Sequence, residues 1–202
     1  QETAIYLQDD IKVSNNFSLN AGLRGVMFSQ LGPYTSKVSG EEFGRLEPAI
    51  TYTGLEPRMS FRYGLSKNTS IKGGVTMANQ FLHLVSNSAS TLPTDVWVPS
   101  TETVRPQRSI QYATGYFQNF QDDKYETSIE VYYKTLKNQI DYADDYVNDI
   151  TKEVEDAFVY GKGRAYGAEF FLKKAKGKLN GWIGYTLSKT ERSFDGIEGG
   201  RW

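Results

Sequence analysis

The sequence predicts an all-β fold, an antiparallel up-and-down meander of about eight strands. Segments in which apolar and polar side chains alternate recur along the chain, and such alternation is typical of strands with one solvated face. Short polar turns and long polar loops follow these segments in alternation. Composition agrees, because 19 glycines and 14 tyrosines stand beside only 6 prolines, which leaves long uninterrupted strands possible.

The first expected hairpin joins residues 5–13 to residues 17–27. Ile5, Leu7 and Ile11 share one face of its first strand, and a turn of Ser14-Asn15-Asn16 leads into the second. Residues 29–54 carry turn signals and are expected to form a long loop with a short strand extension at residues 50–52.

The second hairpin pairs residues 55–63 with residues 69–80 across a tight turn at 65–68. Met59, Phe61 and Tyr63 face one way, whereas Arg58 and Arg62 face the other. A long loop rich in Ser, Thr, Asn and Pro extends to residue 107. This ribbon is therefore apolar on one side and charged on the other.

The second half of the chain repeats the same unit twice. Residues 109–120 and 125–134 flank a polar turn, and residues 164–173 and 179–188 flank another. Glu126 and Glu130 lie on the same side of their strand, which must therefore be wet. A long acidic loop separates the two pairs, and the chain ends in a polar, glycine-rich segment.

Loop length assigns a direction to the meander. All the short turns fall at one end and all the long loops at the other, as in outer-membrane barrels. No run of about 18 apolar residues is present, so no transmembrane helix is expected. Aromatic residues flank the short turns as an interfacial girdle would, at Phe17, Tyr63, Phe120 and Tyr125. The pattern favours a segment of a larger transmembrane β-barrel.

Two other architectures remain open on the same pattern. One is a soluble all-β sandwich that acts as a binding or adhesion module. The other is a small closed barrel that acts as a structural protein or passive outer-membrane pore, since about eight strands suffice to close a barrel.

Composition also limits the chemistry. With 23 basic and 24 acidic residues, the chain has no electrostatic footprint for nucleic acid. No cysteine and one histidine argue against a thiolate or histidine-rich metal site, and no nucleophile elbow is present. The acidic residues Asp141, Asp144, Asp145 and Asp149 do not have EF-hand spacing. We therefore expect no enzyme, no cofactor and no bound metal.

Several short motifs are spread along the chain. They begin with Leu55-Glu56-Pro57-Arg58 and include Asn79-Gln80-Phe81-Leu82-His83-Leu84, Leu92-Pro93-Thr94-Asp95-Val96-Trp97-Val98-Pro99, Glu130-Val131-Tyr132-Tyr133-Lys134 and Gly181-Trp182-Ile183-Gly184-Tyr185-Thr186-Leu187-Ser188. Together they resemble the barrel of TonB-dependent outer-membrane receptors of the Bacteroidetes type. The resemblance covers most of the chain, so residues 1–202 look like a partial barrel domain without the plug and the remaining strands.

The resemblance implies active uptake of a bulky, scarce solute such as an iron chelate, a vitamin or a glycan across the outer membrane of a Gram-negative bacterium. The expected partners are outer-membrane lipid, the plug domain and TonB complex of the intact protein, an unknown solute and, through free strand edges, a second copy.

Two groups of residues are candidates for these contacts. Residues expected near the extracellular mouth, where a solute would bind, are Asn79, Gln80, His83, Asp95, Trp97, Asn138 and Tyr142. Residues expected to face the lumen, and through the resemblance the plug, are Arg58, Arg62, Lys72, Glu126, Glu130 and Glu169. For His83 a single local hydrogen bond in a loop is the competing interpretation.

Overall fold

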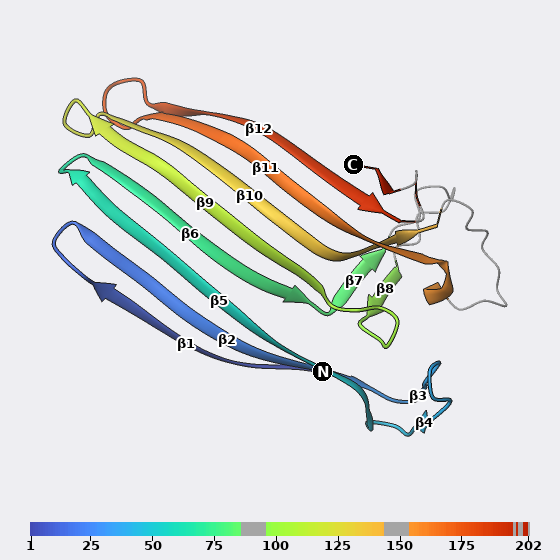
Figure 1. Ribbon diagram of the computed structural model, residues 1–202. Coiled ribbons are helices and arrows are strands. Elements are labelled where there is room, and N and C mark those ends of the chain that lie inside the picture. Colours follow the sequence, from blue (N-terminus) through green and yellow to red (C-terminus); the bar gives the residue numbers. More distant parts are fainter. Residues whose placement is uncertain (86–95, 144–153, 196, 198–199, 202) are drawn as a thin grey trace.

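The computed structural model describes residues 1–85, 96–143, 154–195, 197 and 200–201. Its main element is one antiparallel sheet of eight strands, in which every strand pairs with its neighbour in the order β1-β2-β5-β6-β9-β10-β11-β12 (Figure 1). The strands are β1 (Glu2–Lys12), β2 (Phe17–Leu31), β5 (Pro48–Ser66), β6 (Thr69–Gln80), β9 (Gln107–Phe120), β10 (Tyr125–Tyr142), β11 (Phe158–Lys174) and β12 (Gly181–Phe194). The predicted meander is confirmed.

Smaller elements gather at the end of the sheet where the long loops lie (Figure 1). Two short hairpins, β3 (Tyr34–Thr35) with β4 (Glu42–Phe43) and β7 (Leu82–Val85) with β8 (Val96–Pro99), extend from it together with the 3-10 turn η1 (Val154–Ala157). No helix among the described residues is long and apolar enough to cross a membrane. The short turns all lie at the opposite end, as predicted.

Several strands are longer than the sequence pattern indicates. The expected loop over residues 29–54 is largely strand, because β2 continues to Leu31 and β5 already begins at Pro48. Similarly, β10 continues to Tyr142. In both places the register shifts, between Gln30 and Leu31 and around Asn138. A β-bulge breaks the alternation while the ladder continues, so the pattern ends before the strand does.

The sheet is open, which contradicts both alternative architectures. Within the described residues β1 and β12 are the two edges of the sheet and do not pair with each other. The eight strands therefore do not close into a small barrel. The other sheets in this part of the chain have only two strands each, so no second large sheet packs against the first as a sandwich requires.

The two faces of the sheet differ in chemistry. Ile129, Val131 and Tyr133 stand on one face and are 48%, 46% and 44% exposed. Phe170 and Tyr112 are register partners of Ile129 and Tyr133 on the adjoining strands, and Leu187 on β12 lies one strand further along the same face. Large apolar side chains thus cover this face from β1 to β12 although nothing in the described chain packs on them. We call it the apolar face.

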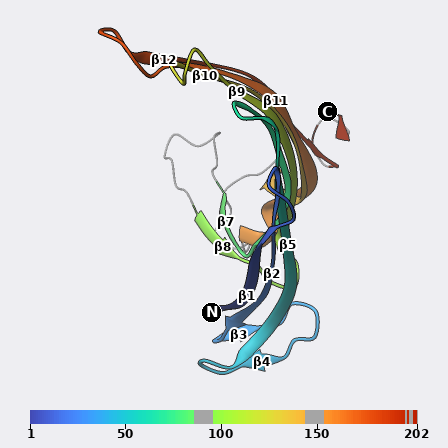
Figure 2. The same cartoon turned by 90° about the vertical axis from the view of Figure 1, so that its left-hand side faces the viewer.

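The opposite, polar face is the concave one. Figure 2 shows the sheet curving around the side on which β7 and β8 lie. Phe81, just before β7, stacks on Phe28 with ring centroids 5.1 Å apart, and Phe28 alternates onto the same face of β2 as Ser18, the register partner of Arg62. The charged side chains of the wall therefore line the hollow of the sheet.

Aromatic pairs border the short turns on the apolar face. Phe17 and Tyr63 contact edge to face with centroids 6.2 Å apart, and Phe120 and Tyr125 stack at 5.2 Å. These are the four aromatic residues that the sequence places beside the turns. Their rings lie on the outward-facing positions of their strands.

Buried apolar side chains gather only at the loop end of the described chain. Val26, Phe28 and Phe81 form one cluster, while Val85, Val98, Val104, Ile140 and Phe158 form another. His83 is fully buried beside the second cluster, where its Nε2 lies 3.0 Å from Ser100 Oγ. Burial lowers the pKa of His83 from 6.5 to about 4. The β7–β8 hairpin thus shares a small core with Val104, Ile140 and Phe158.

Close packing between strands predicts a steric effect at Gly74. A Cβ there would lie 2.7 Å from the Met59 carbonyl oxygen, so Gly74→Val must push two strands apart and should lower the free energy of unfolding by about 1–3 kcal/mol. Gly181→Val is the control, because a Cβ at Gly181 meets nothing within 4 Å. Urea titrations in detergent micelles measure both. Equal losses in the two variants would contradict the assigned β5–β6 register.

Burial of His83 predicts a pH-dependent hairpin. The unfolded hairpin takes up a proton below pH 6.5, whereas the folded one does so only near pH 4, so folding free energy is lost as the pH falls through this window, by about 3 kcal/mol in total. Amide protection factors over β7 and β8 should fall accordingly. His83→Gln keeps a polar partner for Ser100 but cannot titrate, and its protection should be flat between pH 7 and pH 4. A similar fall in this variant would rule out His83 as the cause.

Candidate functional site: the charged concave face

The concave face carries one row of side chains that crosses the whole sheet in register. From β1 to β12 its members are Lys12, Ser18, Arg62, Lys72, Gly115, Glu130, Glu169 and Thr186. We call these residues the charged row. Four of the six predicted wall residues belong to it, and the other two, Arg58 and Glu126, alternate onto the same face.

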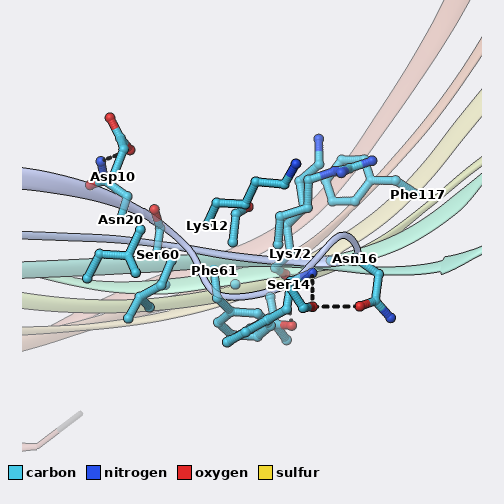
Figure 3. Close-up of a pocket in the computed structure, with 18 of the residues that line it drawn as sticks. Asp10, Lys12, Ser14, Asn16, Asn20, Ser60, Phe61, Lys72 and Phe117 are labelled. Atoms are coloured by element: carbon cyan, nitrogen blue, oxygen red, sulfur yellow. Dashed lines mark hydrogen bonds between the residues drawn. The ribbon is translucent and has the colours of Figure 1, made fainter.

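The basic half of the row lies on β5 and β6. Arg62 is the direct register partner of Lys72, and Lys72 Nζ lies 4.1 Å from the centroid of the Phe117 ring. Figure 3 shows Lys12, Lys72 and Phe117 on one side of the sheet, while Phe61 points to the other. These residues border an open hollow of about 740 Å³. The negative face of the Phe117 ring attracts this ammonium group and holds it in place.

The acidic half lies on β10 and β11. Glu130 is the direct register partner of Glu169, and both side chains are exposed. Glu130 accepts a hydrogen bond from Ser128 Oγ at 3.3 Å, which does not neutralise it. A second hollow of about 570 Å³ is bordered by both glutamates and also by Arg62, Lys72 and Phe117. The two hollows are therefore neighbouring parts of one charged surface.

Other charges on this face are neutralised within the wall. Lys173 Nζ donates to both carboxylate oxygens of Glu126 at 3.1 Å. Nearer the loop end, Arg24 bridges Glu56 at 2.7 Å and Glu2 at 2.9 Å. Glu126 thus differs from Glu130 and Glu169, although all three were predicted together as wall residues.

The chemistry of this face is suited to binding. Exposed guanidinium, ammonium and carboxylate groups attract oppositely charged surfaces. Within the described residues no group of three or more His, Cys, Asp or Glu side chains is arranged to hold a metal ion. The one histidine lies outside the face, buried in the β7–β8 unit.

Three of the predicted mouth residues have structural contacts at the loop end of the sheet. The backbone N–H and Nδ2 of Asn79 both donate to Glu56 Oε1, at 2.7 and 3.1 Å. Gln80 Nε2 donates to the Leu82 carbonyl. Asn138 occupies the β-bulge with a φ of 54° and donates to the Pro106 carbonyl. Each amide fixes the local chain course where strands continue into loops.

The remaining mouth candidates fall into different environments. His83 is buried, so its imidazole is not on the surface that a solute meets. Tyr142 packs edge to face on Phe158 with centroids 5.3 Å apart. Trp97 is 61% exposed on β8, opposite the exposed Leu84, which makes it the most accessible aromatic group of the set. Asp95 lies outside the described residues.

A polar network at the loop end was not predicted from sequence. Ser36 Oγ donates to the Glu102 carboxylate, Thr103 Oγ1 donates to Glu155 at 2.5 Å, and Lys37 bridges Asp156 at 3.0 Å. It ties the segment around β3 and β4 to the segment before β9 and to η1. These residues come from three separate loops and no alternation marks them, so sequence pattern gave no signal for their contacts.

Comparison with known proteins identifies a family and several solved structures that share this architecture. The chain matches the family model "TonB dependent receptor-like, beta-barrel" over residues 1–202, while a search of curated proteins finds no match. The FrpB iron transporter of Neisseria meningitidis (F3-3 variant) shares the fold with a TM-score of 0.67 at 12% identity, over 100% of this chain and 27% of that chain.

The ferric-catecholate import receptor Fiu of E. coli K12, in its closed form, gives a TM-score of 0.55 at 15% identity, over 96% of this chain and 28% of that chain. At these identities the likeness shows the fold, and the chain spans less than a third of either structure. With the family model matched from the first residue to the last, the chain belongs to the TonB-dependent receptor-like β-barrel family.

Proposed function

We propose that residues 1–202 are a partial barrel domain of a TonB-dependent receptor of the Bacteroidetes type, set in the outer membrane of a Gram-negative bacterium. The observation that carries the proposal is the pairing of an exposed apolar face with a charged concave face across all eight strands. A barrel wall between lipid and a polar lumen needs this division. The sequence motifs quoted above support the Bacteroidetes type.

The length of the strands also supports the proposal that the sheet crosses a membrane. A tilted strand crosses a bilayer in about 9–11 residues, whereas β10 has 18 residues and β5 has 19. The excess lies at the loop end, where both buried clusters lie and the bulge around Asn138 interrupts β10. These upper parts then stand in water above the membrane, and the short turns lie on the periplasmic side.

The transported solute is proposed as a bulky, scarce compound: an iron chelate, a vitamin or a glycan. Two proteins that share the fold are an iron transporter and a ferric-catecholate import receptor, so ferric chelates are the first class to test. Trp97 is proposed to contact the solute at the outer mouth, because an exposed aromatic ring offers a large apolar surface at low entropic cost.

The remaining partners follow from the barrel proposal. Lipid covers the apolar face, and the plug domain meets the concave one, with energy supplied through the TonB complex. The free edges of β1 and β12 pair with further strands in the intact receptor, and in the isolated chain they would pair with a second copy.

Placement in the membrane predicts a face-dependent effect of charge. Val131→Arg puts a cation in the middle of the apolar face and should destabilise the full-length receptor by about 2–4 kcal/mol in lipid. Thr190→Arg puts the same charge on the concave face, where the residue is exposed, and should change stability little. Urea unfolding in vesicles, with outer-membrane yield as a second readout, checks both. Equal tolerance of both arginines would argue against a lipid-facing Val131.

Uptake by the intact receptor tests the function directly. Cells with the full-length receptor should accumulate a labelled ferric chelate, vitamin or glycan, and a protonophore should abolish accumulation because transport depends on the energised inner membrane. Trp97→Ala should weaken solute binding about tenfold, equivalent to roughly 1.4 kcal/mol. Trp182→Ala is the control, since Trp182 is also exposed but lies beside a short turn.

If cells with and without the receptor accumulate all three solute classes equally, the transport proposal is contradicted. Accumulation that persists after the protonophore would favour a passive pore. Equal losses in the Trp97 and Trp182 variants would remove Trp97 from the binding surface.

A further inference from the structure

Three basic side chains lie next to one another on the apolar face, toward the loop end of the sheet. Arg108 on β9 is the register partner of Lys137 on β10, and Lys137 is the register partner of Lys162 on β11. All three side chains are exposed. Arg108 Nη2 lies 2.9 Å from the sulfur atom of Met77, an apolar residue on the same face. We call Arg108, Lys137 and Lys162 the basic row.

A row of tyrosines crosses the same strands below the basic row. Tyr112, Tyr133 and Tyr166 are direct register partners and are 52%, 44% and 36% exposed. From Tyr125, beside a short turn, to Tyr133 the strand rises by about 27 Å, or about 21 Å along the membrane normal at a strand tilt of about 40°. Aromatic girdles usually flank an apolar band about 25 Å tall. In the proposed barrel the tyrosine row thus marks the outer boundary of the hydrocarbon layer.

The basic row stands farther out in the same direction. Lys137 follows Tyr133 by four positions on β10, which is about 13 Å along the strand and about 10 Å along the membrane normal at the same tilt. In the proposed barrel this is the depth of the lipid headgroups and not of the hydrocarbon. Long cationic side chains at this level extend readily toward headgroup phosphates.

The sheet does not supply the counter-charges for this row. Neither Arg108 nor Lys137 has an ion pair within the part of the chain that the structure describes. In the register row just below, Glu191 is the one carboxylate, and two cations already hold it, Arg164 at 2.7 Å and Lys189 at 2.6 Å. Like charges at directly opposed positions destabilise a sheet. The basic row is therefore suited to an anion from outside the chain.

We propose that the basic row binds the headgroup of an outer-leaflet glycolipid that carries more than one phosphate. The inference rests on the proposed function and adds to it the class of lipid that this part of the wall selects. The row spans three neighbouring strands, or about 10 Å, so the single phosphodiester of an ordinary phospholipid would not reach all of it. Guanidinium and ammonium groups both bind phosphate, and a guanidinium does so through two parallel hydrogen bonds. The acyl chains of the lipid then lie on the apolar face below the tyrosines.

Lipid binding to the purified full-length receptor tests the proposal. Native mass spectrometry measures the Kd for lipid A with two phosphates and for the same lipid with both phosphates removed. The unaltered receptor should bind the phosphorylated form about a hundredfold more tightly, because each basic side chain near an anionic surface contributes about fivefold. Arg108→Gln with Lys137→Gln and Lys162→Gln should bind both forms alike.

Two controls separate the basic row from general electrostatic attraction. Lys124→Gln with Lys174→Gln and Lys178→Gln removes the same charge beside the short turns and should keep the preference for the phosphorylated lipid. Inorganic phosphate at the same concentration as the lipid should not displace it, because inorganic phosphate has no acyl chains to lie on the apolar face.

The lipid site would be overturned by an unaltered receptor that binds both lipids equally, by a preference that survives in the basic-row variant, by an equal loss in the short-turn variant, or by displacement with inorganic phosphate. Uptake of a labelled ferric chelate, vitamin or glycan is measured on the same receptors in cells. Solute import by a receptor without the lipid preference removes the lipid site alone. A receptor that shows the preference but imports none of the three solute classes counts against the transport function alone.

Discussion

Cross-strand register is the constraint on which this structure depends. Side chains alternate between the two faces of a strand, so a shift of one residue between any two strands would exchange their apolar and polar sets. The observed register keeps Phe61, Val131 and Leu187 on one face from β5 to β12. The same register brings Arg62 opposite Lys72 and Glu130 opposite Glu169. The apolar face and the charged row are thus consequences of one alignment.

The loop end shows what happens where this alignment is released. At Asn138 an extra residue enters β10 and the register shifts, after which Ile140 is buried in a cluster with Val85 and Phe158. A bulge increases local twist and bends the strand. Beyond the bend, apolar and polar side chains no longer divide between two faces. This end of the sheet forms a small core together with the β7–β8 unit. The β-bulges therefore mark the boundary between the regular part of the sheet and the folded elements at its loop end.

The difference between the regular part of the sheet and its loop end explains which features could be predicted from the sequence alone. Period-two alternation depends only on neighbouring residues, and it correctly predicted β6 at residues 69–80. It failed beyond the bulges, where alternation no longer follows the ladder. The burial of His83 and its contact with Ser100 depend on segments brought together by folding. That like charges lie directly opposite each other could be seen only from the register between strands. The lengths of the turns restrict this register but do not determine it.

The regular part of the sheet has no core of its own. The apolar residues that are buried in the described chain all lie toward the loop end, while between there and the short turns one face exposes apolar side chains and the other exposes charges. Backbone hydrogen bonds alone contribute little net free energy, because the unfolded chain bonds to water equally well. In the barrel proposed above, burial of the apolar face in lipid would supply the missing hydrophobic term, while the charged face would remain in contact with a polar lumen.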